Sequence, residues 1–484
     1  MSNNTRGTLA ILVVGRVLQI AIMLAGIRLS THFLTAAEIG NLYIVVTVTN
    51  FFGLFLINPV GQYINRFTNF WYGSGALLNK LFVFNFYVLF VVLMSFIMVA
   101  LLPAVGIGST IDHALFMLVV AVFVYANTWN QTIAPMLNLL GYRVVFTFLS
   151  VVSAAAAVLL SFILVRYYQP TGIVWVLGQA GAFLFMGVAS LICFVLCVPQ
   201  SLSFNSVKKD LNFKGIAAVA RFALPLSISV LFLWMQGQSF RLLVEGYLGI
   251  EYLGYMGVGL SIAVAVGSAL EGLIMQWVGP AIYRQMGNAQ EFPGFFSRLA
   301  NFLLPIYLLM AMFVSFMSVF LIEILVGEKY MPSCVFLIIG IWCEFFRIAT
   351  NLFATAAHSK MNTRILMLPY AVGGLGTLLG VYLSVQSSSY DILIPLILPV
   401  MAGFALIAMY VQINSLLSVR LKAGGFLWLF FFGGLFASAA FFYSLSNDLI
   451  YAILILSIFG LYFLSVVFFY YRNQGGAQAL GVEV

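Results

Sequence analysis

Hydrophobic residues dominate the chain in long runs, which short clusters of charged, Gly, Pro and Asn residues separate. A helix needs about 20 apolar residues to cross a bilayer, whereas a barrel strand needs about ten residues of alternating polarity. The runs have the helical length, so the pattern predicts an all-α polytopic membrane protein with about 14 transmembrane helices. We expect these spans near residues 8–33, 38–65, 80–104, 112–140, 144–167, 172–198, 216–248, 252–283, 295–326, 331–358, 364–387, 391–419, 425–445 and 448–471.

The distribution of charged residues supports the predicted spans and indicates which ends of them are cytoplasmic. Only 7% of the residues are charged, whereas a soluble domain has about 25%. Lys and Arg gather on one side of the predicted spans, and only Arg166 and Lys329 fall on the other. Because basic residues accumulate in cytoplasmic loops, both termini are expected in the cytoplasm. The net charge of +8 reflects this topology, and no soluble segment has the basic, aromatic face that binds nucleic acid.

A sequence repeat divides the spans into two sets. The stretch VGQYINR at 60–66 recurs as VGPAIYR at 278–284. Leu34 and Gly40 have the same spacing as Leu248 and Gly254, and the interval 130–143 matches 351–364. These landmarks are offset by 214, 218 and 221 residues, so spans 1–6 and 7–12 are copies of one unit. Each copy starts on the cytoplasmic side, which predicts parallel repeats about an axis along the membrane normal.

The repeat predicts four regions. Residues 1–198 form an N-lobe of six spans, and residues 216–419 form a C-lobe of six spans. Between them, residues 199–215 are polar and basic with interspersed Phe and Leu, as in a cytoplasmic linker that lies on the membrane surface. Residues 420–484 carry the last two spans and a cytoplasmic tail.

Arginines on the first span of each copy are the leading candidates for substrate binding. Arg28 precedes Gly40 by twelve residues and Arg241 precedes Gly254 by thirteen, so the two are nearly equivalent in the repeat. An arginine at mid-membrane costs about 2.5–3.5 kcal/mol, and a guanidinium can donate two parallel hydrogen bonds to phosphate. We therefore predict a cationic cavity that binds an anion through Arg16, Arg28 and Arg241, to which Arg221 contributes from the cytoplasmic start of its span.

Local alternatives exist for these arginines. Arg241 precedes Glu245 by one helical turn, so the two could pair on their own helix. Arg28 could reach outward to the membrane surface beside His32. Gln236 and Gln238 lie at a depth from which they could line the cavity.

Acidic residues within spans are the second group of candidates. Glu271 lies mid-span with no basic residue three or four positions away, so we expect it to pair with an arginine of the first or seventh span or to couple transport to H⁺ or Na⁺. Glu344 and Arg347 are three residues apart and predict a structural ion pair. Arg66 and Arg284 end the repeated motif at the predicted cytoplasmic mouth.

Motifs for catalysis are missing from the sequence. The three His and four Cys have no metal-binding spacing, and neither a GxSxG nor a Walker sequence occurs. We therefore expect no enzymatic activity, no metal and no cofactor.

Several stretches resemble one family of membrane transporters. RLSTHFLTAAEIGNLY at 28–43, followed by INPVGQYINR, resembles the start of polysaccharide and O-antigen flippases, the Wzx-like branch of the multidrug/oligosaccharidyl-lipid/polysaccharide (MOP) exporter superfamily. The second copy agrees in ARFALPLSISVLF and FRLLVEGYLGIEYLGYMGVG. The resemblance covers roughly residues 1–420 and rests on hydropathy and on a few Gly, Pro, Arg and Glu positions.

The resemblance implies a fold and a substrate. It implies two six-helix lobes in a V, whose helices 1, 2, 7 and 8 line a cavity that alternates between the two membrane faces. In similar lipid II flippases, two further C-terminal helices shape a lipid groove. The implied substrate is an undecaprenyl-pyrophosphate oligosaccharide, an O-antigen or other repeat unit of lipopolysaccharide or surface polysaccharide. It would cross the bacterial inner membrane, with a polysaccharide polymerase and a chain-length regulator as possible partners.

Two other functions stay open. A cation-coupled drug antiporter of the same superfamily would need Glu245 or Glu271 and could dispense with the arginines, but the first span lacks the acidic residue expected of that branch. A polyprenyl-phosphate glycosyltransferase would use the arginines for the same phosphate chemistry. The absence of any loop longer than about 20 residues argues against that enzyme.

Overall fold

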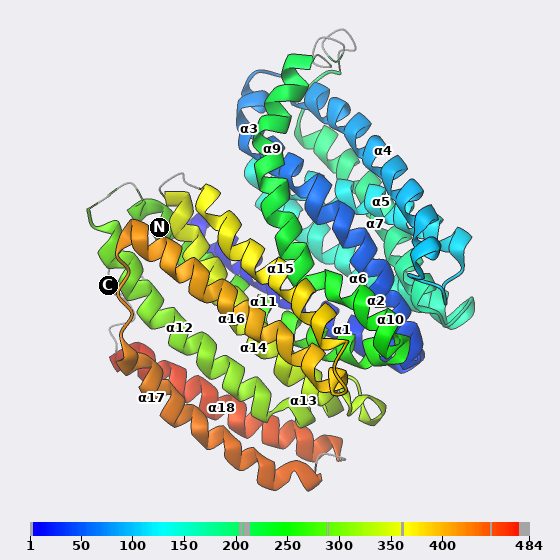
Figure 1. The fold of residues 1–484 in the computed structure, drawn as a ribbon. Coiled ribbons are helices and arrows are strands. Elements are labelled where there is room, and N and C mark those ends of the chain that lie inside the picture. Colours follow the sequence, from blue (N-terminus) through cyan, green and yellow to red (C-terminus); the bar gives the residue numbers. More distant parts are fainter. Residues whose placement is uncertain are drawn as a thin grey trace. The chain divides into compact units, whose positions relative to one another are not determined.

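A computed structural model shows a chain built from helices (Figure 1). It describes residues 3–202, 207, 213–286, 288, 290–359, 363–445 and 448–473. Within these residues every regular element is helical, and 14 helical stretches are long and apolar enough to cross a membrane. The predicted fold class and number of spans are confirmed.

In the part of the chain that the structure describes, eight of the predicted spans are single α-helices, whereas the second, third, seventh, ninth, eleventh and thirteenth combine several helical segments. In chain order, the elements are α1 (Asn3–Phe33), α2 (Ala36–Phe51), the π-helix η1 (Phe52–Ile57), α3 (Asn58–Gly73), α4 (Leu77–Leu101), η2 (Leu102–Val105), α5 (His113–Leu139), α6 (Arg143–Tyr167), α7 (Gly172–Cys197), α9 (Phe213–Trp234), the π-helix η3 (Met235–Ser239), α10 (Phe240–Leu248), α11 (Ile250–Gln285), α12 (Phe292–Phe316), α13 (Ser318–Leu325), η4 (Glu328–Tyr330), α14 (Ser333–Ser359), η5 (Thr363–Leu366), α15 (Met367–Ser384), α16 (Tyr390–Leu417), α17 (Ala423–Gly434), η6 (Leu435–Leu445) and α18 (Leu449–Asn473).

The chain forms two compact units, residues 1–254 and 255–484. Helices α9 and α10 pack with the first unit, since α9 contacts α3 and η1 and α10 contacts α2. The boundary between units therefore lies inside α11, later than the 199–215 linker. Lobes of a transporter are defined by what moves together, so the division into lobes at 198 and 216 stays a prediction.

Small residues allow helices of the first unit to approach closely. Helices α5, α6 and α7 contact one another, and Gly178 of α7 lies against the backbone of Ser161 on α6. The Ser161 hydroxyl donates to the carbonyl of Trp175 at 2.7 Å. Glycine contacts and hydroxyl bonds of this kind hold helices together in a bilayer, where burial of apolar surface gives no driving force.

The repeat is visible as a reciprocal contact at the starts of α2 and α11. A Cβ atom at Gly40 would collide with the carbonyl of Ile250, and one at Gly254 would collide with the carbonyl of Ala36. The offset of 214 residues relates Ala36 to Ile250 and Gly40 to Gly254. The glycine of each copy therefore lies against the carbonyl four residues before the equivalent glycine of the other copy, as a two-fold relation requires.

In the second unit, α12 contacts α14, α17 and α18, and α13 contacts α18. Figure 1 shows α17 and α18 side by side along α12. A buried apolar cluster joins α13, η6 and α18, formed by Met317, Phe320, Ala439, Ala452 and Ile455. The two helices outside the sequence repeat are thus packed onto the core of this unit.

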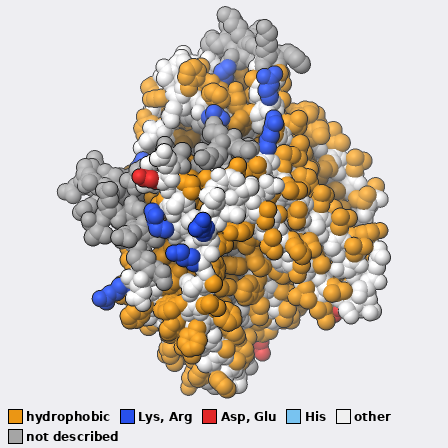
Figure 2. Space-filling model, turned by 60° about the vertical axis from the view of Figure 1, so that its left-hand side comes forward, with side chains coloured by type: hydrophobic (Ala, Val, Ile, Leu, Met, Phe, Trp, Pro, Cys, Tyr) orange, Lys and Arg blue, Asp and Glu red, His pale blue; other side chains and the backbone are white. Residues whose placement is uncertain are grey.

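The surface is apolar, as expected of a membrane protein. Hydrophobic side chains cover most of the face seen in Figure 2, where charged side chains are few. Large apolar residues of the spans are widely exposed, including Leu196 at 79% and Phe441 at 85%. Such exposure would be unfavourable in water and is favourable against lipid chains.

Candidate functional site

Arg241 is a buried arginine in the middle of a charge-poor region. It is 7% exposed on α10, and its Nη1 donates to Gln238 Oε1 at 2.7 Å and to Thr47 Oγ1 at 3.5 Å. The guanidinium carbon lies 5.1 Å from the centre of the Tyr43 ring, a cation–π contact. Its Nε is buried without a hydrogen-bond partner, and no described residue accepts a hydrogen bond from Nη2.

Two π-helical segments shape the surroundings of Arg241. The segment η3 (Met235–Ser239) joins α9 to α10 directly before Arg241, and η1 (Phe52–Ile57) joins α2 to α3 and contacts α9. Trp234 Nε1 donates to the carbonyl of Thr47 at 3.1 Å, and its ring meets Phe51 edge to face at 5.1 Å. A π-bulge inserts one extra residue per turn and redirects the side chains that follow, a device common at functional sites.

The local alternative, in which Glu245 pairs with Arg241 on the same helix, is not what the structure shows. Glu245 Oε1 accepts a hydrogen bond from the backbone N–H of Gly108, in the loop before α5, at 2.9 Å. Its other oxygen, Oε2, is buried without a partner. Within the described part of the chain, no carboxylate oxygen lies within 4.0 Å of Arg241. A full positive charge is thus held by neutral groups.

The other predicted cavity arginines occupy different surroundings. Arg16 is partly buried, and its Nη1 donates to Gln19 on its own helix at 3.4 Å. Arg28, Arg221 and Arg66 are exposed. Among the described residues, the contacts of Arg241 come from α2, η3 and α10.

Of the two glutamines predicted to line the cavity, one contacts Arg241 and the other does not. Gln238 bonds Arg241, whereas Gln236 is partly buried without a bond to it. The side chain of Arg284 lies outside the described residues.

A second charged cluster lies within the second unit. Arg347 of α14 donates from Nε to both oxygens of Glu344 at 3.0 Å and from Nη2 to Glu344 Oε2 at 2.7 Å. The same Nη2 lies 3.0 Å from Glu271 Oε2 on α11. Asn351 Nδ2 donates to Glu271 Oε1 at 3.1 Å. The predicted pair of Glu344 and Arg347 is present and extends into a network with two carboxylates and one guanidinium.

The partner of Glu271 is therefore Arg347, and the expectation of an arginine from the first or seventh span is wrong in this arrangement. The reason is close packing of α11 on α14. A Cβ at Gly267, one turn before Glu271, would lie 2.6 Å from Glu344 Oε2. Gly340 similarly faces Ala263 and Leu260. Glycines on both helices bring the carboxylates to one guanidinium.

Sequence reasoning missed several participants. Asn351 belongs to the sequence pattern only as the start of the repeated interval 351–364, and no pattern in the sequence indicates Tyr43 or Thr47. Glu323 of α13 was also missed, and its Oε2 is buried without a partner. Only the acidic Glu323 carried a signal, as an ionisable residue within a span. In the described residues, no group of three or more His, Cys, Asp or Glu side chains is arranged to hold a metal ion.

Fourteen membrane-length helices in the described part of the chain, with charged groups inside the spans, define a polytopic membrane protein. Among solved structures, the chain is similar to the lipid II flippase MurJ in an inward closed conformation, with a TM-score of 0.74, 13% identity, and coverage of 96% of this chain and 99% of that one. It is also similar to a mutant of the MATE transporter VcmN from Vibrio cholerae, with a TM-score of 0.56, 14% identity, and coverage of 87% and 97%.

The chain therefore has the fold of MurJ and of the MATE transporters, the fold that the sequence resemblance to the MOP superfamily implied. No family model and no curated protein matches the chain by sequence. At 13% and 14% identity, the structural likeness establishes the fold.

Proposed function

We propose that the protein is a flippase for an undecaprenyl-pyrophosphate-linked oligosaccharide, an O-antigen or other surface-polysaccharide repeat unit. It moves this lipid from the inner to the outer leaflet of the bacterial inner membrane by alternating access. The observation that carries the proposal is Arg241, a guanidinium inside a span with no carboxylate partner among the described residues. The fold shared with a lipid II flippase supports it.

The free edge of Arg241 has the geometry for a phosphate. Nε and Nη2 form the edge of a guanidinium that donates two parallel hydrogen bonds. In Arg347 this edge is occupied by the Glu344 carboxylate, whereas in Arg241 no described residue accepts from it. A central arginine costs about 2.5–3.5 kcal/mol, which Gln238 and Tyr43 offset only in part. A pyrophosphate oxygen pair would complete the site once α2 and α10 separate.

Other parts of the chain have supporting roles in this proposal. Arg16, Arg28 and Arg221 line the route of the anion, and Arg66 and Arg284 attract it at the cytoplasmic mouth. The lobes at 1–198 and 216–419 move as rigid bodies. Both termini are cytoplasmic, a topology that the distribution of basic residues supports. Membrane potential contributes about 2.3 kcal/mol per elementary charge per 100 mV, and H⁺ or Na⁺ at Glu271 is the alternative drive.

The test is transport by purified protein in liposomes that contain a fluorescent, short-chain lipid-pyrophosphate oligosaccharide. Arg241→Ala and Arg28→Ala should each abolish flipping while leaving the amount of folded protein unchanged. Arg166→Ala is the matched control, because Arg166 is an exposed arginine at the opposite end of the spans from the predicted mouth. Native activity in both Arg241→Ala and Arg28→Ala would exclude a cationic substrate site.

One observation favours a second candidate, a cation-coupled antiporter. The cluster of Glu271, Glu344 and Arg347 has one more carboxylate than guanidinium, and the fold is also that of a MATE transporter. In this case Glu271→Gln should abolish uptake of a drug cation driven by a proton or sodium gradient, and Arg241→Ala should leave it intact. Arg241→Ala separates the two candidates, because the flippase proposal predicts that this variant loses transport of the lipid substrate.

A further inference from the structure

A row of amide side chains follows one face of α3. Asn58, Gln62, Asn65 and Asn69 are spaced by four, three and four residues, so they share a stripe about 60° wide on the helix. Gln62, Asn65 and Asn69 are exposed, and Asn58 is partly buried. The only charged residue of α3, Arg66, borders this stripe one turn from Gln62 and from Asn69. These four amide residues form an amide strip.

The opposite face of α3 is anchored by aromatic packing. Tyr63, Phe67 and Trp71 project about 170° away from the centre of the strip. The Tyr63 and Phe67 rings are 4.7 Å apart, and Phe67 stacks on Trp71 at 5.7 Å. Tyr63 also meets Phe222 of α9 edge to face at 5.5 Å. Because this face is packed, the direction of the amide strip is fixed.

The amides of the strip make few bonds within the protein. Gln62 Nε2 donates to Asn58 Oδ1 at 3.4 Å. In the part of the chain that the structure describes, the side chains of Asn65 and Asn69 bond no protein group. Each amide offers one acceptor oxygen and two N–H donors. Such groups are costly against hydrocarbon, so the strip faces water or a polar ligand.

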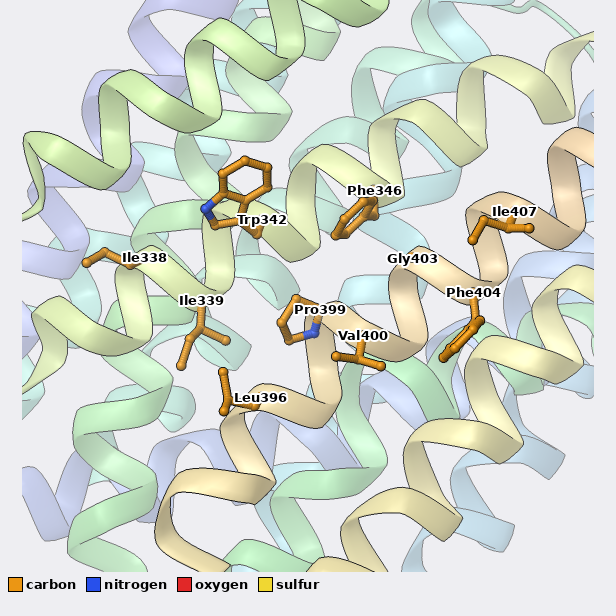
Figure 3. Close-up of a pocket in the computed structure, with 10 residues that line it drawn as sticks. All are labelled: Ile338, Ile339, Trp342, Phe346, Leu396, Pro399, Val400, Gly403, Phe404 and Ile407. Carbon is orange, nitrogen blue, oxygen red and sulfur yellow. The ribbon is translucent and has the colours of Figure 1, made fainter. Parts of the chain in front are cut away.

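A surface suited to lipid has a different composition. The pocket between α14 and α16 in the second unit is lined by ten residues, and Figure 3 shows Trp342, Phe346 and Phe404 among them. None of the ten is Asn, Gln or a charged residue. Hydrocarbon chains can cover such walls, whereas they would leave amides unsatisfied. The amide strip therefore needs a polar occupant.

The strip lies at the predicted cytoplasmic end of its span. The distribution of basic residues places the start of α2 at the outer face. At about 1.5 Å per residue along α2, η1 and α3, Asn58 is about 33 Å and Asn69 about 50 Å from Ala36. The hydrocarbon core is about 30 Å thick, and the headgroups extend a bilayer to about 40–45 Å. The amides are thus level with the inner headgroups, where the glycan of an inner-leaflet lipid lies.

The internal repeat indicates that the fold does not require these amides. The offset of 218 residues aligns Gln62 with Pro280 and Asn65 with Tyr283, so the second copy lacks the strip. Helix α11 nevertheless continues through these positions to Gln285. The arginine that borders the strip is repeated, as the shared topology explains. The amides need another reason.

We propose that the amide strip binds the sugars of the lipid-linked substrate at the cytoplasmic entrance, an inference that rests on the proposed function. Sugar hydroxyls are neutral and both donate and accept hydrogen bonds, as amides do, whereas arginine and lysine only donate. Residues one turn apart on a helix are about 5–6 Å from one another, so an oligosaccharide along α3 meets several amides. Arg66, at the border, meets the pyrophosphate next to the first sugar. The strip thereby recognises the glycan before the pyrophosphate reaches Arg241.

The test measures binding of two fluorescent lipids to the native protein in detergent. One is a short-chain lipid pyrophosphate that carries a neutral trisaccharide, and the other is the same lipid pyrophosphate without sugar. The native protein should bind the glycan-bearing lipid more tightly. Asn65→Ala and Asn69→Ala should each raise the Kd of that lipid about two- to tenfold, the loss expected from one hydrogen bond, and leave the Kd of the sugar-free lipid unchanged.

Two further variants serve as comparisons. Arg66→Ala should raise the Kd of both lipids by the same factor, because both carry the pyrophosphate. Gln386→Ala is the matched control, since Gln386 is an exposed amide outside α3, and it should bind both lipids as the native protein does. Alanine favours a helix over asparagine, and the unchanged Kd of the sugar-free lipid verifies that the asparagine variants are folded.

Flipping of the glycan-bearing lipid in liposomes separates this inference from the proposed function. Where the native protein flips this lipid, the inference alone is overturned by equal native Kd values for the two lipids, by unchanged binding in both asparagine variants, or by an equal loss for both lipids. A loss confined to the glycan-bearing lipid, in a protein that flips no glycolipid, supports the strip and overturns the proposed function. Binding of neither lipid and no flipping overturn both.

Discussion

At the scale of single residues, two buried arginines show what a guanidinium does in a membrane protein. Arg347 uses its Nε–Nη2 edge for the Glu344 carboxylate and reaches Glu271 with the same Nη2. Arg241 leaves that edge without a partner among the described residues and is surrounded by Gln238, Thr47 and Tyr43. Removing a paired arginine leaves its carboxylate buried without a cation, whereas an unpaired arginine is available to an anionic ligand.

The satisfied arginine gives a stability prediction. Arg347→Met leaves Glu344, which is 5% exposed, buried without its cation, so the free energy of unfolding should fall by about 3 kcal/mol. Denaturant unfolding in detergent measures this. The double variant Glu344→Gln with Arg347→Met should recover most of the loss, because it removes both charges of the most buried pair and leaves only Glu271, whose Oε1 accepts a hydrogen bond from Asn351. A double variant as unstable as the single one would contradict the ion-pair account.

At the scale of elements, packing of helix starts depends on glycines at equivalent positions of the repeat. Gly40 and Gly254 each face a backbone carbonyl of the other copy, which leaves no space for a side chain. The repeat in the sequence indicated that these glycines correspond, since both lie six residues after a leucine. That they contact each other's helices could not be predicted, because spacing along the chain carries no information on which helices meet.

Substitution at these glycines should therefore destabilise the packing of α2 on the start of α11. Gly40→Val and Gly254→Val should each cost about 1–3 kcal/mol, the range for overpacking a tight contact. Gly61→Ala is the control, since a Cβ there meets no atom within 4 Å and alanine favours the helix by up to about 1 kcal/mol. Thermal unfolding in detergent compares the three, and equal stability of Gly40→Val and native protein would refute the contact.

At the scale of the whole molecule, the fold was predictable and the sites were only partly so. Apolar runs of about 20 residues predicted the 14 spans, because lipid requires each span to pair its own backbone. The i, i+3 spacing of Glu344 and Arg347 predicted their contact, since both lie on one helix. The pairing of Glu271 with Arg347 and the association of Arg241 with Thr47 depend on packing between distant helices, which residue spacing does not predict.

Whether Arg241 binds an anion is tested by comparing the transport of two lipids that differ only in the linkage between lipid and oligosaccharide. One carries its oligosaccharide on a pyrophosphate and the other on an uncharged glycosidic bond, and both are offered to the native protein and to Arg241→Lys. We expect the native protein to flip the pyrophosphate lipid about 10- to 100-fold faster, because a charge-assisted bidentate contact contributes that much. Lysine keeps the charge but loses the planar fork, so most of this preference should disappear. Equal rates for both lipids in the native protein would contradict an anion-binding role for Arg241.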